Sequence, residues 1–195
     1  MINIIYKLVG QTEEFKNSFP CFDMFNQFIQ SNSDLIFFLN CNGNGLTQLP
    51  KLPLCLRVLM CNDNKLTKLN DLPPDLLILK CAQNDLDELP ELPPNLLKLN
   101  CCRNKLNKLP EIPVKLIYLK CGFNKLTELP QLPQNLKSLG CRNNHLIQLP
   151  QLPTSISRFD CSVNHIINIS DIDMSFIKYK MTYNQTKVKL YYHQL

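Results

Sequence analysis

A strict period of 20 residues constrains this chain more than any other feature. Cysteine recurs at Cys41, Cys61, Cys81, Cys101, Cys121, Cys141 and Cys161. An asparagine follows each of these cysteines by three positions, from Asn44 to Asn164, and recurs at Asn184, where Met181 replaces the cysteine. Such a period is typical of a solenoid, in which each unit is one supersecondary element stacked on its neighbours.

The repeating unit reads L-x-x-L-x-C-x-x-N-x-L-x-x-L-P-x-L-P-x-x. It predicts a short strand from about two residues before each cysteine to one residue after it. Because side chains alternate along a strand, Leu99 and Cys101 are expected to point inward. Their neighbours Lys98, Asn100 and Cys102 then point outward, onto the concave side. Successive strands are expected to run parallel, ~4.8 Å apart, so that each repeat position becomes a ladder of equivalent side chains.

The asparagine and proline positions have structural interpretations. A buried asparagine amide supplies two donors and an acceptor, which suits the backbone groups where the chain leaves a strand. The Leu-Pro-x-Leu-Pro segment, as in residues 129–133, favours an extended, polyproline-like wall on the convex side, because proline restricts its own φ and the conformation of its predecessor. A unit this short leaves no room for a convex helix.

These motifs resemble those of the leucine-rich-repeat family and, within it, the 20-residue bacterial class found in secreted effectors of the YopM and IpaH types. The resemblance covers about residues 34–184 and implies a curved parallel sheet on the concave side. Cysteine stands here where that class usually carries an aliphatic residue. The IpaH-like effectors add a ubiquitin-ligase domain, which is not expected here, because only residues 185–195 follow the last repeat asparagine.

The predicted organisation has three parts. Residues 1–33 form an N-terminal cap, residues 34–173 form seven 20-residue repeats, and residues 174–195 form a degenerate eighth repeat with a C-terminal cap. The first cap is predicted to contain a short helix that begins near Ser18 and Pro20. One face of that helix would carry Phe22, Phe25, Phe28 and Ile29. The segment before it, through Thr12 and Glu14, is a second short helix or a strand.

The end of the chain keeps part of the repeat pattern. The inward places of the eighth strand fall on Phe176, Tyr179 and Met181. Beyond them, the residues expected to fold across the last repeat are Val188, Leu190, Tyr191 and Tyr192.

The cysteines are interpreted as reduced, buried structural thiols. Neighbours in a straight column would lie ~4.8 Å apart, farther than the Cβ spacing that a disulfide prefers. One column also cannot supply the converging ligands of a tetrahedral zinc site. The remaining cysteines are Cys21, Cys55 and Cys102, of which Cys102 is expected on the concave face. No signal peptide and no transmembrane segment are recognised, which favours a reducing cytoplasmic setting, including the cytoplasm of a host cell.

Neither a catalytic site nor a metal or cofactor site is predicted. No Ser-His-Asp set, phosphate-binding glycine loop or H-E-x-x-H motif appears, and an open sheet offers a nucleophile little pocket. His145 and His165 occupy equivalent positions in adjacent repeats, about 4.8 Å apart if the register holds. They are interpreted as surface residues at the rim, and the protein is expected not to be an enzyme.

The outward strand positions are the predicted binding surface. An apolar group at the N-terminal end comprises Phe38, Val58, Met60 and Ile78. The cationic remainder, with Tyr118 in its middle, comprises Lys80, Lys98, Lys120, Arg142, Arg158, Lys178 and Lys180. An apolar patch beside charge favours a protein partner with an acidic surface. Nucleic-acid binding through the basic stripe is the alternative. A further possibility is that the N-terminal segment covers the patch and the lysines only confer solubility.

Overall fold

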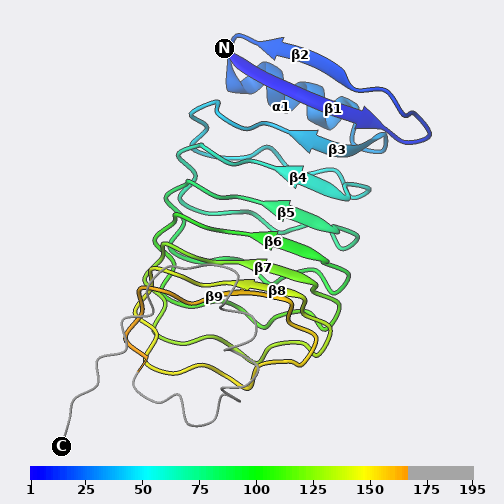
Figure 1. The fold of residues 1–195 in the computed structure, drawn as a ribbon. Helices are drawn as coiled ribbons and strands as arrows, with labels where there is room; N and C mark the ends of the chain where they lie inside the picture. The colour runs from blue at the N-terminus through cyan, green and yellow to red at the C-terminus, as the bar shows by residue number, and fades with distance from the viewer. Residues whose placement is uncertain (167–195) are drawn as a thin grey trace, which may run out of the picture.

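A computed structural model of the chain describes residues 1–166, which form a solenoid built on one nine-stranded sheet (Figure 1). The sheet order is β2-β1-β3-β4-β5-β6-β7-β8-β9. The strands are β1 (Ile2–Leu8), β2 (Phe15–Phe19), β3 (Ile36–Asn40), β4 (Val58–Met60), β5 (Ile78–Lys80), β6 (Lys98–Asn100), β7 (Tyr118–Lys120), β8 (Ser138–Gly140) and β9 (Arg158–Asp160). One helix, α1 (Phe22–Ser31), lies near the N-terminus. The predictions made for Phe176, Lys178, Tyr179, Lys180, Met181, Val188, Leu190, Tyr191 and Tyr192 fall outside the described residues.

The repeat strands stack in parallel and in one register, as the period predicts. Each of β3 to β8 pairs with the next strand so that equivalent residues of adjacent repeats are partners, for example Leu79 with Leu99. The strands end one residue before the cysteine, two residues earlier than expected. The second residue after the cysteine, such as Arg103, takes a left-handed backbone conformation with a positive φ, which turns the chain out of the strand.

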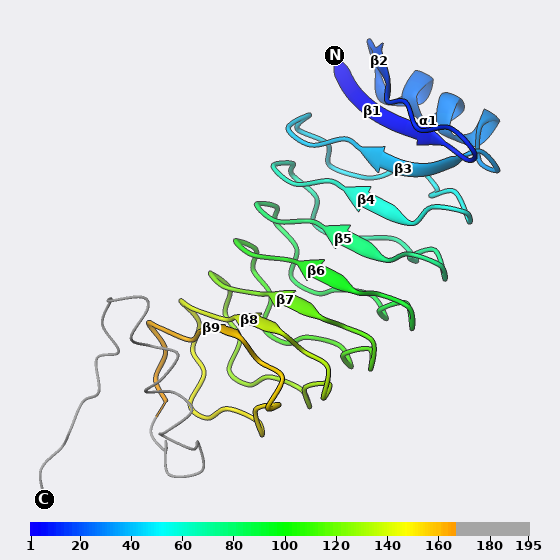
Figure 2. The ribbon, with the colours of Figure 1, turned by 45° about the vertical axis from the view of Figure 1, so that its right-hand side comes forward.

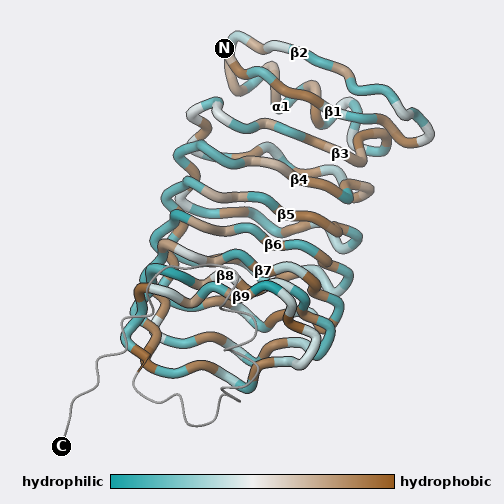
Figure 3. Tube along the Cα trace, in the orientation of Figure 1, coloured by the Kyte–Doolittle hydropathy of each residue, from teal (hydrophilic) through white to brown (hydrophobic). Residues whose placement is uncertain are grey.

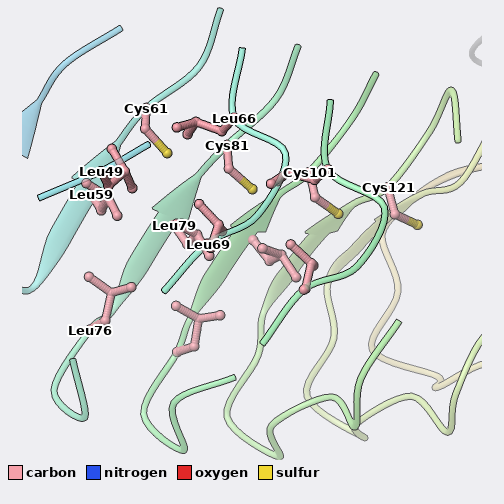
Figure 4. Close-up of a cluster of buried hydrophobic side chains, with 14 of the residues drawn as sticks. Leu49, Leu59, Cys61, Leu66, Leu69, Leu76, Leu79, Cys81, Cys101 and Cys121 are labelled. Carbon is pink, nitrogen blue, oxygen red and sulfur yellow. The ribbon is translucent and has the colours of Figure 1, made fainter. Parts of the chain in front are cut away.

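The core lies between the sheet and the opposite wall of each turn. Leu79 and Cys81 are completely buried, and their equivalents as far as Leu139 and Cys141 are buried as well. Figure 4 shows the cysteine side chains pointing the same way into the interior. Hydrophobic and hydrophilic residues alternate around each turn (Figure 3). Burying one leucine contributes up to about 1.5–3 kcal/mol. Over residues 34–166 the wall opposite the sheet contains neither helix nor strand, in agreement with its prolines.

The asparagine column bonds neighbouring turns together. Asn84 donates from Nδ2 to the carbonyl oxygens of Cys61 (2.9 Å) and Cys81 (3.1 Å). Its Oδ1 accepts from the backbone N–H of Leu66 at 3.0 Å. Each such amide therefore closes its own turn and ties it to the turn before, as the sequence predicts.

The N-terminal cap is a β-hairpin with a helix rather than a helix alone. Strands β1 and β2 are antiparallel, and β1 also pairs antiparallel with β3, so the hairpin extends the sheet at one end (Figure 2). This resolves the segment before the helix as a strand pair. The predicted helix start was wrong, because Ser18 lies in β2 and α1 begins at Phe22. Phe25 and Ile29 on α1 are buried, while Phe22 and Phe28 pack partly buried against the same core.

Candidate functional site

The outward-facing positions of the strands form two straight rows on one surface. These two rows, together with the residue that follows each cysteine, are called the outer sheet face. The first row contains Phe38, Val58, Ile78, Lys98, Tyr118, Ser138 and Arg158. The second contains Asn40, Met60, Lys80, Asn100, Lys120, Gly140 and Asp160. Arg142 follows Cys141 beside these rows. The register therefore brings all the predicted partner-binding residues within the described part of the chain onto one face.

The apolar end of this face is partly exposed. Its residues Phe38, Val58, Met60 and Ile78 are each half-buried by their neighbours rather than fully exposed. The N-terminal hairpin joins the sheet edge to edge and does not lie over them. Its Lys7 is paired with Phe38, with Nζ 5.8 Å from the centre of the ring. The cap therefore continues the face.

Residues of β1 and β2 belong to this face although the sequence analysis left them out. Ile5 pairs with Asn40 on one side and with Lys16 on the other. A hollow of about 380 Å³ lies at this junction, lined mainly by polar residues that include Asn3, Asn17 and Asn40. The alternation of buried Ile2, Ile4 and Tyr6 was the signal in the sequence that could have revealed this strand.

The cationic part of the face is well exposed. Lys98, Lys120, Arg142 and Arg158 are exposed, and Lys80 is half-buried. The Nζ atom of Lys98 lies 5.1 Å from the centre of the Tyr118 ring, which attracts the cation through its π-electrons. This part of the face also carries an acid, Asp160, whose Oδ2 lies 3.9 Å from Nε of Arg142.

Two further residues join this cationic part at the edge of the face. The guanidinium groups of Arg103 and Arg142 both lie over the ring of Phe123, at 4.5 and 4.7 Å from its centre. Arg103 and Phe123 are each the second residue after a repeat cysteine, the position that takes the left-handed backbone conformation. Sequence reasoning missed Arg103 because this position reads as part of a turn. The recurrence of the same position every 20 residues was nevertheless visible in the sequence.

Solved structures of bacterial effectors match this fold. The leucine-rich-repeat domain of a Shigella effector has a TM-score of 0.67 and 36% sequence identity, over 74% of this chain and 65% of that one. YopM of Yersinia pestis, a leucine-rich effector protein, has a TM-score of 0.59 and 38% identity, over 65% of this chain and 36% of that one. The chain is a leucine-rich-repeat protein of the bacterial type.

This leucine-rich-repeat protein spans less than two thirds of the length of either matched structure. No protein-family model matches its sequence, and no curated protein does. The similarity to leucine-rich-repeat effectors supports a protein-interaction module. The absence of enzymatic activity stays a prediction.

The cysteine column of the leucine-rich-repeat protein is buried and unlinked. All ten cysteines are free thiols. Burial raises the pKa of the Cys41 thiol to about 12 and raises the pKa of Cys81 well above its ordinary value. Cys55 donates from Sγ to the carbonyl oxygens of Ser33 and Ile36. Cys102 is half-buried on the outer sheet face, whereas Cys21, immediately before α1, is the exposed thiol.

The two repeat histidines lie on the surface of the leucine-rich-repeat protein. The rings of His145 and His165 stack with 5.7 Å between their centres and 12° between their planes, somewhat farther apart than the strand spacing suggested. Both residues are exposed. Among residues 1–166, no three His, Cys, Asp or Glu side chains converge as metal ligands would. Over the same residues, no helix has the length and apolar character that a membrane span requires.

Proposed function

We propose that this leucine-rich-repeat protein binds an acidic partner protein through the outer sheet face, and that it serves as an effector or adaptor acting on a host protein. The observation that supports this most directly is the continuous, in-register face on which an apolar group adjoins a row of cations. The similarity to Shigella and Yersinia effectors supports the same class of function.

The two parts of the face are expected to contribute differently to binding. Partly buried apolar side chains such as Ile78 and Met60 become fully desolvated under a partner and supply affinity. Exposed cations such as Lys98 and Lys120 act over a longer range and mainly raise the association rate. The rigid strand register holds both groups in place before binding, which lowers the entropy cost.

The first test identifies the partner by its dependence on the face. Proteins are captured from cell extract with the wild-type chain, with Lys98→Glu/Lys120→Glu and with Lys68→Glu/Lys108→Glu, and then quantified by mass spectrometry. The last pair makes the same charge change at exposed lysines outside the outer sheet face. A partner is a protein with an acidic surface that the first variant loses and the control keeps.

The second test measures kinetics with that purified partner. Lys98→Glu/Lys120→Glu should slow association about tenfold and weaken its salt dependence. Ile78→Ser/Met60→Ser should speed dissociation about tenfold while circular dichroism stays unchanged. The proposal is wrong if Glu91→Lys/Glu111→Lys, at exposed acids of the opposite wall, disrupts the complex and these changes do not. It is also wrong if single-stranded RNA binds more tightly than any captured protein.

A further inference from the structure

A row of side-chain oxygens along the outer sheet face satisfies the backbone N–H of the residue that follows most of the cysteines. Asn42 Oδ1 accepts from the N–H of Asn62 at 2.7 Å. In turn, Asn62 Oδ1 accepts from the N–H of Ala82 at 2.8 Å. Elsewhere the acceptor comes from the strand itself, as for Cys102, whose N–H donates to Asn100 Oδ1 at 3.3 Å. These donors are thus paired along the face.

The row is interrupted at Arg142. The Gly122 N–H donates to the Cys102 thiol. Gly122 has no side chain that could accept from the Arg142 N–H, which has no hydrogen-bond acceptor among residues 1–166. A Cβ at Gly122 would lie 3.5 Å from the Arg142 nitrogen and only 2.9 Å from its carbonyl oxygen, so the close approach of the two turns requires glycine. Gly122 is buried by this approach, whereas Arg142 is exposed. The Arg142 N–H is therefore left without an internal partner, at an exposed residue.

A second arginine lies close to the Arg142 side chain. The guanidinium groups of Arg103 and Arg142 are both held over the ring of Phe123, at 4.5 and 4.7 Å. Stacking on a ring occupies the face of a guanidinium group and leaves its N–H edge free for an anion. The stack therefore orients two arginines before any ligand arrives.

The thiol of Cys102 reports a third cation at the same place. Burial raises the pKa of the Cys102 thiol, whereas the hydrogen bond from the Gly122 N–H and the charges of Lys120, Arg142 and Arg103 act in the opposite direction. All three cations are thus close enough to the half-buried Cys102 thiol to act on its charge. The one acid paired with them within the described residues is Asp160, 3.9 Å from Arg142, and its Oδ1 already accepts from the N–H (3.1 Å) and hydroxyl (2.7 Å) of Ser162.

We propose that Arg103, Lys120 and Arg142 form a binding site for a phosphorylated side chain of the partner protein. This rests on the proposed function, which it makes more specific. Three cations and a backbone N–H outnumber the two oxygens and single charge of a carboxylate. A phosphate monoester carries nearly two negative charges and three acceptor oxygens, which match this set of donors. Arginine clusters are a recurring means of recognising phosphorylated segments.

The first experiment uses Cys102 as a reporter. The wild-type chain is alkylated with iodoacetamide in the presence of a short glycine-flanked phosphoserine peptide, and each site is quantified by mass spectrometry. The peptide should slow the alkylation of Cys102 several-fold and leave that of exposed Cys21 unchanged. Matched peptides with serine or glutamate should not protect Cys102 at the same concentration. Equal protection by the glutamate peptide would overturn the proposal.

The second experiment measures affinity by NMR titration of the backbone amide of residue 142 with the same phosphopeptide. Arg103→Gln and Arg142→Gln should each weaken binding about tenfold, the loss expected for one charge-assisted hydrogen-bonding group. The control variant Lys65→Gln/Lys125→Gln removes two exposed cations, each of which directly follows a repeat asparagine. It should leave the affinity unchanged. Circular dichroism checks that every variant is folded.

Several outcomes would refute this site. Unchanged affinity in the Arg103→Gln/Arg142→Gln variant would show that the peptide binds elsewhere. Equally tight binding of inorganic phosphate would indicate a site for the free ion, and tighter binding of single-stranded RNA would indicate a nucleic-acid site. If the phosphopeptide fails but a captured acidic protein still depends on Lys98 and Lys120, only this inference is lost and the proposed function remains.

Discussion

Replacing Asn124 by alanine removes one amide that serves two turns of the solenoid. Its Oδ1 accepts from the backbone N–H of Leu106 at 3.1 Å, and its Nδ2 donates to the carbonyl oxygens of Cys101 and Cys121 at 3.0 Å each. The N–H of Leu106 is buried and has no other acceptor among residues 1–166. The two carbonyl groups keep a second donor, from Asn104 and Asn144 respectively.

The expected loss of stability follows from this difference. A buried donor without an acceptor costs about 1–3 kcal/mol, whereas each bond lost at a carbonyl that keeps another partner costs about 0.5–1.5 kcal/mol. Asn124→Ala should therefore lower the free energy of unfolding by roughly 2–4 kcal/mol, because such contributions are not fully additive. This is a large fraction of the about 5–15 kcal/mol that stabilises a typical domain.

Urea unfolding followed by far-ultraviolet circular dichroism measures this loss, with the slope of the transition checked for cooperativity. Asn107→Ala, at an exposed asparagine of the adjacent turn, is the control and should change stability by less than about 0.5 kcal/mol. If Asn124→Ala and Asn107→Ala cost the same, the asparagine column does not hold the turns together and the reasoning is refuted.

Three other predictions concern the thiols and the left-handed turn. A thiol reagent should modify Cys21 first, then Cys102 and Cys55, and the buried column last; rapid labelling of the whole column would contradict its inward placement. Because burial raises the folded-state pKa of the column thiols, their contribution to stability should be fully present below the unfolded thiol pKa of about 8.5. Urea unfolding at a series of pH values should show stability falling as the pH rises above that value, and more steeply than in a variant with fewer column thiols. Val163→Gly should raise the free energy of unfolding by about 0.5–1 kcal/mol, since this exposed β-branched residue has a positive φ. Val114→Gly, exposed without a positive φ, should not stabilise; a loss of stability in Val163→Gly would contradict the strain.

The repeat part of the fold could be predicted because one physical requirement recurs in every unit of the array. Leu79 and Cys81 point inward, as do their equivalents, since only stacking buries the apolar side of a unit. The asparagine interpretation held for the same reason, because each turn leaves equivalent backbone groups to be paired. The rows of the outer sheet face followed once the register was known. Their role in binding stays a prediction.

The ends of the array were harder to predict. The cap has no period, and its strand β1 is stabilised by pairing with β3, a strand distant in the sequence. The short apolar alternation of Ile2, Ile4 and Tyr6 is compatible with a strand, but only the open edge of the sheet selects it. The aromatic residues near Phe25 were recognised as one face, whereas the first residue of the helix was misplaced.

The sequence by itself determined which residues point into the solenoid and which lie on its outer sheet face, because a repeated unit imposes the same packing on every turn. The tertiary structure alone decided how neighbouring turns combine their variable residues. Gly122, Phe123 and Arg142 read as unrelated positions along the chain. They meet because a left-handed residue redirects Phe123 and because the missing side chain of Gly122 lets the next turn approach. Such contacts depend on backbone conformation and on the equivalent residue of the neighbouring repeat, which a pattern within one repeat does not contain.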